Sequence, residues 1–85
     1  VGLDRQGKHQ EAIQHYVEAL RISPDDAQSH NNLGVALAEQ GRFKEAVAHF
    51  TKALRIDPNF KEAQRNLELS RELMEKSSTG PKGAQ

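Results

Sequence analysis

The sequence repeats itself with a period of thirty-four residues. Twelve of the twenty-four residues from Val1 to Pro24 recur unchanged between Val35 and Pro58. Recurrence at a fixed period of this length is typical of solenoid proteins, in which one supersecondary unit is copied and stacked on its neighbour. We therefore expect a chain that offers a binding surface rather than one that catalyses a reaction.

Apolar residues recur at the spacing of amphipathic helices, and no segment alternates apolar and polar residues as a half-buried strand does. Good helix formers, chiefly Ala, Leu, Glu, Gln, Lys and Arg, dominate the chain. We predict helices over residues 8–22, 27–40, 42–56 and 60–76. Their expected core stripes are Ala12, Ile13, Tyr16, Ala19 and Leu20; Leu33, Ala36 and Leu37; Ala46, Val47, Phe50, Ala53 and Leu54; and Ala63, Leu67, Ser70 and Met74.

Residues that end or begin helices recur with the same period. Pro24 and Pro58 are each expected to stop the helix that precedes them. Gly7 and Gly41 lie between helical segments, where glycine tolerates the left-handed conformation of a helix C-cap. The patterns that resemble capping boxes at the start of the following helices are Asp25-x-x-Gln28 and Asn59-x-x-Glu62.

The segment from Ala27 to Phe60 resembles a tetratricopeptide repeat (TPR), a unit of two antiparallel helices. His30 stands where the TPR motif usually has tryptophan, and His9 stands where the second copy has Phe43. A small residue is expected at Gly34, because the two helices of a repeat cross closely there. The resemblance is carried by Leu33, Gly34, Leu37, Gly41, Phe43, Ala46, Phe50, Ala53 and Pro58.

This resemblance implies an all-α, antiparallel helix-turn-helix solenoid of about two and a half repeats. Residues 1–26 would form a partial repeat with its second helix intact, and residues 27–60 a complete repeat. Residues 61–76 would form a capping helix, so the chain would be the C-terminal portion of a longer array. Residues 77–85 contain no large apolar side chain and are expected to be a disordered tail or linker.

In TPR arrays the first helix of each repeat lines the concave face, so the resemblance also implies a peptide-binding groove. Asn32 and Asn66 are separated by one period and resemble the asparagine ladder of the superhelical TPR region of O-linked N-acetylglucosamine transferase. An amide can hold a peptide main chain through both its donor and its acceptor; the alternative is that Asn32 bonds to a neighbouring helix. The predicted peptide-binding residues are Gln28, Asn31, Asn32, Val35, Glu39, Glu62, Arg65, Asn66 and Leu69, with Ala38 and Leu73 beside them.

A carboxylate clamp, by which another class of TPR proteins holds acidic chaperone C-termini, is not expected. Asn32 fits one position of that clamp, but Glu62 and Asn66 stand where it needs Lys and Arg. Lys61 and Arg65 have the right spacing but are displaced by one residue, which is about 100° around a helix.

Composition argues against several other classes. Twelve basic and twelve acidic residues give a formal net charge of zero, whereas a nucleic-acid surface needs a basic excess. The absence of cysteine excludes disulfides and thiolate metal sites. No apolar run approaches the roughly 18 residues of a membrane-spanning helix. Nothing in the sequence assigns the chain to a cellular compartment.

The four histidines do not indicate a metal site. His15 and His49 occupy equivalent places in successive repeats and should lie about 10 Å apart, the spacing of packed helices. That is too far to share a zinc ion, so the histidines are expected to be partly exposed surface residues. No phosphate loop, dinucleotide fingerprint or nucleophile motif is present, so neither a cofactor nor an enzymatic activity is expected.

Three functions fit these observations. The chain is expected to be a protein–protein interaction module that binds an extended peptide or a partner protein. The alternatives are a self-assembly segment of a larger protein and a substrate-presenting TPR tail of a glycosyltransferase. Self-assembly, as a homo-oligomer or a helix-swapped dimer, would cover the faces that the terminal helices expose, including Ile13, Tyr16 and Leu73.

Overall fold

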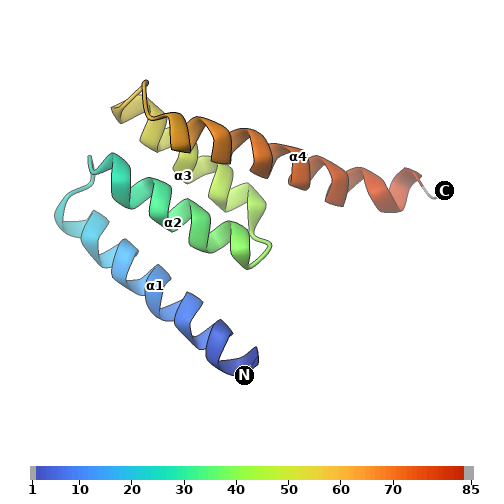
Figure 1. The fold of residues 1–85 in the computed structure, drawn as a ribbon, viewed down its shortest axis with the longest axis horizontal. Coiled ribbons are helices and arrows are strands. Elements are labelled where there is room, and N and C mark those ends of the chain that lie inside the picture. Colours follow the sequence, from blue (N-terminus) through green and yellow to red (C-terminus); the bar gives the residue numbers. More distant parts are fainter. Residues whose placement is uncertain (1, 84–85) are drawn as a thin grey trace.

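Between residues 2 and 83 the chain forms four α-helices joined by short turns (Figure 1). The computed structural model describes the backbone of residues 2–83 and the side chains of residues 8–76. No strand occurs within residues 2–83, so the predicted all-α helix-turn-helix solenoid is confirmed, with helices for about two repeats. The helices are α1 (Gly2–Ile22), α2 (Ala27–Glu39), α3 (Phe43–Ile56) and α4 (Lys61–Gly83).

Each helix packs against the next one in the chain, and α2 also contacts α4. As Figure 1 shows, α2 therefore lies between α1 and the α3–α4 pair, and α4 extends past the other helices toward the C-terminus. The sequential packing of antiparallel helices is what a helical repeat protein needs, because each unit buries its apolar face on its neighbour.

The core is centred on the crossing of α2 and α3. Phe50 is 1% exposed, and its ring lies directly against the backbone of Gly34. A methyl group on Gly34 would lie 2.5 Å from Cε1 of that ring, so only glycine permits this approach. The predicted role of Gly34 is thus confirmed. The other buried members of the cluster are Leu33, Leu37 and Ala46, with Ile13, Tyr16, Leu20 and Leu67 packed around them.

Of two predicted signals at helix ends, one is confirmed and the other is corrected. Gly41 has φ 79°, the left-handed conformation expected of a glycine that ends a helix. α2 begins with a side-chain cap, but the cap is Asp26 rather than the predicted Asp25. The Asp26 carboxylate accepts hydrogen bonds from the backbone N–H groups of Gln28 and Ser29 and from the Ser29 hydroxyl, which lowers the pKa of Asp26.

The predicted turn at Gly7 is wrong, because α1 runs without a break from Gly2 to Ile22. Continuing α1 instead gains one backbone hydrogen bond per residue. Against this gain stands the cost of a glycine inside a helix, about 0.5–1 kcal/mol.

The predicted end of the last helix at residue 76 is also wrong, since α4 continues to Gly83. The backbone of residues 77–83 is therefore helical rather than a disordered linker, and the last two residues of the predicted tail lie outside the described part of the chain. The composition of residues 77–85 did not predict this helical extension. An existing helix can be extended without a new nucleation step and without an apolar partner.

His30 links three elements inside the molecule, contrary to the prediction that all four histidines lie partly exposed at the surface. It is 6% exposed. Its Nε2 lies 2.9 Å from the carbonyl oxygen of Pro24 in the α1–α2 turn, and its Nδ1 lies 3.2 Å from Nδ1 of His49 on α3. Since a carbonyl only accepts, Nε2 of His30 carries hydrogen. Neutral His30 then accepts at Nδ1 from His49.

We predict that Gly34→Ala destabilises the protein by about 1–3 kcal/mol, because the added methyl group overpacks against the Phe50 ring. Urea denaturation followed by circular dichroism would measure the change. The double variant Gly34→Ala/Phe50→Leu should lose less unfolding free energy than the two single variants lose together, because the smaller side chain makes room for the added methyl group. A Gly34→Ala protein as stable as the parent would contradict this account of the α2–α3 crossing.

We predict that the protein loses stability as the pH falls below about 6.5, the usual pKa of histidine. The pKa of His49 is lowered, first because burial disfavours the charged ring, and then by repulsion from His30 in its protonated form and from Lys52, with Glu45 opposing them. The unfolded chain therefore takes up this proton at a higher pH than the folded chain. The stabilisation is present above the unfolded pKa and is lost as the pH falls through the folded one.

The measurement is the free energy of unfolding at about pH 7.5 and about pH 5. His49→Asn retains a donor near Nδ1 but does not titrate, so it should reduce the difference between the two conditions. His15→Asn is the matched control, because His15 is exposed and occupies the same place one repeat earlier. Equal pH dependence in both variants would show that the His30–His49 contact is not the source.

Candidate functional site

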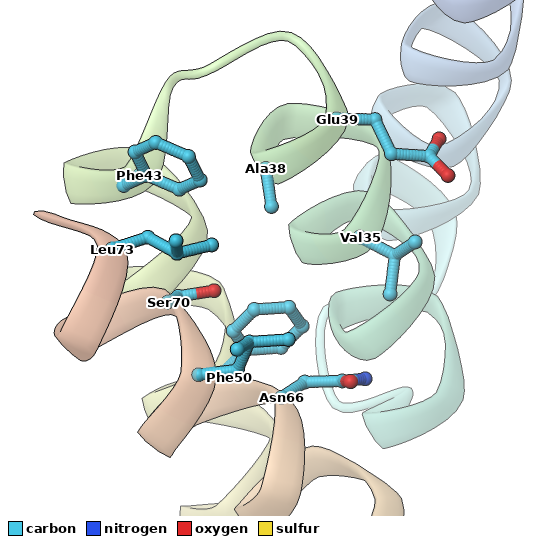
Figure 2. Close-up of a pocket in the computed structure, with 9 residues that line it drawn as sticks. Val35, Ala38, Glu39, Phe43, Phe50, Asn66, Ser70 and Leu73 are labelled. Carbon is cyan, nitrogen blue, oxygen red and sulfur yellow. The ribbon is translucent and has the colours of Figure 1, made fainter.

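A pocket of about 270 Å³ opens between α2 and α4, above the side chains of α3 (Figure 2). Most of its wall is apolar. Two of the large apolar side chains at the pocket remain open to solvent, since Leu69 is 53% exposed and Leu73 is 38% exposed. The lining residues are Val35, Ala38 and Glu39 of α2, Phe43 and Phe50 of α3, and Asn66, Leu69, Ser70 and Leu73 of α4.

Glu39 is the one ionisable residue among the pocket residues. Figure 2 shows it at the rim, with its carboxylate turned toward α1. There its Oε1 lies 3.0 Å from Nε2 of His9. The pocket thus combines an apolar wall with one carboxylate at its edge and the amide of Asn66 across from it, a pattern typical of ligand sites.

The structure brings together four of the nine predicted peptide-binding residues: Val35, Glu39, Asn66 and Leu69 all line the pocket. Ala38 and Leu73, predicted to lie beside them, line it too. Outside the pocket lie Gln28, Asn32, Glu62 and Arg65, of which Asn32 is partly buried and the other three are exposed.

Sequence reasoning missed Phe43, Phe50 and Ser70 as pocket residues. Phe50 was expected only to fill the space between helices, and it does so while one side of its ring faces the pocket. Ser70 was assigned to the core stripe and is 3% exposed. The signal that identifies it is its spacing, because Asn66 and Ser70 are four residues apart and so share one helix face.

Asn31 was predicted to face the groove, and this prediction is wrong because its side chain is 0% exposed. Its Oδ1 accepts a hydrogen bond of 3.1 Å from Nδ2 of Asn66, which connects α2 to α4. No protein group among the described residues accepts a hydrogen bond from Nδ2 of Asn31. Neighbouring residues on a helix point in different directions. Because Asn31 and Asn32 are adjacent and identical, the sequence does not reveal which of the two amides turns inward.

Asn32 and Asn66 do not bond to each other. The Oδ1 of Asn32 accepts a hydrogen bond of 3.0 Å from Nε2 of Gln28, four residues earlier on α2. The predicted alternative, in which Asn32 bonds to a neighbouring helix, is therefore not what the structure shows. These contacts orient the two amides: Asn66 keeps its Oδ1 as an acceptor, and Asn32 keeps its Nδ2 as a donor.

Comparison with protein families agrees with this arrangement of helices. A model described as TPR repeat matches residues 5–41, and a model described as Tetratricopeptide repeat matches residues 27–60. The chain carries tetratricopeptide repeats. The two matches together run over residues 5–60, which include most of α1 and all of α2 and α3, and the second spans the residues expected to form a complete repeat. None of the curated proteins compared with the chain matches it.

Tetratricopeptide repeats are scaffolds that generally mediate protein–protein interaction and are typically not enzymes. Within the described residues, no three His, Asp or Glu side chains gather closely enough to hold a metal ion. Among the described helices, none has the length and apolarity needed to cross a bilayer.

We predict that Asn31→Leu changes the free energy of unfolding by less than about 1 kcal/mol, although Asn31 is the more buried amide. Leucine removes a buried N–H group that has no partner, and the half-buried Asn66 can turn to water. Asn66→Ala should cost more, about 1–3 kcal/mol, because it leaves the whole Asn31 amide buried and unpaired. Urea denaturation of both variants tests this order, and the reverse order would contradict it.

Proposed function

We propose that this TPR chain binds an extended peptide segment of a partner protein in the groove between α2 and α4. The pocket is the observation that carries the proposal, because it is apolar, open, and flanked by the exposed side chains of Leu69 and Leu73. Its volume of about 270 Å³ falls below the range of about 300–1,000 Å³ that is usual for drug-sized ligands. A single large apolar side chain suits it better.

The two oriented amides support contact with a peptide main chain. Asn66 offers a carbonyl oxygen to a peptide N–H, and Asn32 offers an N–H to a peptide carbonyl. Main-chain contacts of this kind would hold many sequences, so selectivity would come from the side chains around them. Those proposed for this role are Gln28, Val35, Glu39, Glu62, Arg65 and Leu69. Affinity should be modest, since little area is buried.

Random-peptide display against this chain tests the proposal. We predict that the enriched peptides contain a large apolar residue and that Leu69→Glu weakens their binding at least about tenfold, because it places a charge at the apolar wall. Val17→Glu is the matched control: Val17 is 47% exposed, similar to Leu69 at 53%, but lies on α1 outside the pocket. Binding measured by fluorescence anisotropy should be unchanged in this control.

Two results would contradict the proposal. In the first, no peptide is enriched. In the second, both glutamate variants bind the enriched peptides as the parent does, so that the pocket is not where they bind. Asn32→Ala separately tests the main-chain contact, and it should weaken peptides of different sequence by a similar factor.

A second candidate function is self-association through α1, which one observation favours. Val17 is 47% exposed and lies one residue from Tyr16, which packs against the core. A second copy could cover this face. In that case Val17→Glu should shift the protein toward the monomer in light scattering, while Leu69→Glu should not. A monomer at high concentration in the parent protein would exclude this function.

A further inference from the structure

We infer that the groove selects peptides in which the large apolar residue is flanked by Lys or Arg, and that Glu39 makes this selection. The inference deepens the proposed function and rests on it, because it names the chemical class of the peptide that the pocket between α2 and α4 would take.

The first observation is the charge of the pocket. Of the nine residues that line it, Glu39 alone is ionisable, so an otherwise neutral wall carries a single negative charge. The Glu39 side chain is 55% exposed and lies at the rim rather than at the base. A cation on the ligand can therefore reach it without entering the apolar part of the pocket, which avoids the cost of burying a charge.

The second observation is that Glu39 retains an unused acceptor. Its Oε1 is 3.0 Å from Nε2 of His9 on α1, where a neutral imidazole donates its one N–H. The described residues offer no hydrogen-bond or ion-pair partner to Oε2. Among the described side chains, His9 thus contacts only one of the two carboxylate oxygens, and the other can accept from a ligand.

The third observation concerns the cation nearest to Glu39 in the sequence, Arg42. Its Nε and Nη2 donate two hydrogen bonds of 2.8 Å to the two carboxylate oxygens of Glu45. This bidentate contact lowers the pKa of Glu45 and raises that of Arg42. Because Arg42 is held by Glu45, it does not pair with Glu39, and no other Lys or Arg among the described side chains does so.

The experiment uses one peptide taken from the display selection, synthesised with Lys, Gln or Glu beside its apolar residue. We expect the parent protein to bind the Lys form about threefold more tightly than the Gln form, and the Gln form more tightly than the Glu form, as for a surface ion pair. Glu39→Gln should make the three affinities equal, and Glu39→Lys should reverse their order. The preference should weaken as salt is added.

Glu68→Lys is the matched control, because it makes the same change in charge on α4 at an exposed position outside the pocket lining. It should keep the order of the parent. If the parent binds all three peptides equally while Leu69→Glu still abolishes binding, the inference about Glu39 is contradicted but peptide binding in the groove is supported. If Leu69→Glu has no effect, the proposed function itself is wrong, and this inference falls with it.

Discussion

The contact between Phe50 and the backbone of Gly34 sets the distance at which α2 and α3 cross, and most of the molecule depends on that distance. With the ring pressed against a residue that has no side chain, Leu33, Leu37 and Ala46 close around it as one buried cluster. α1 and α4 then pack against this cluster through Tyr16, Leu67 and their neighbours. The same ring faces the pocket, so the core contact also shapes the candidate binding site.

Polar contacts then set the register of the helices around this core. His30 connects the α1–α2 turn to α3, and the Asn31–Asn66 hydrogen bond connects α2 to α4. Buried polar groups are costly when unpaired, so each contact favours one alignment of its helices over shifted ones. The exception is Nδ2 of Asn31, for which the described residues supply no acceptor.

The groove exists because α4 does not cover α2 completely. α2 and α4 contact each other directly, through the asparagine pair among others, while Val35, Ala38, Leu69 and Leu73 remain around an open space. The open pocket costs little stability, because α3 already buries the central apolar cluster through Ala46 and Phe50. It leaves apolar side chains exposed around the pocket, with Glu39 at its edge.

The sequence by itself determined the repeat, the helical class and the main core positions. These follow from patterns along the chain: apolar spacing predicts which face is buried, Gly41 meets a local need for positive φ, and the repeat motif marks Gly34 as the helix crossing. The tertiary structure alone decided which of two adjacent asparagines turns inward, that His30 is buried, and that Phe50 serves both core and pocket. These outcomes depend on what neighbouring helices offer to each side chain, and contacts between distant segments leave no periodic trace in the sequence.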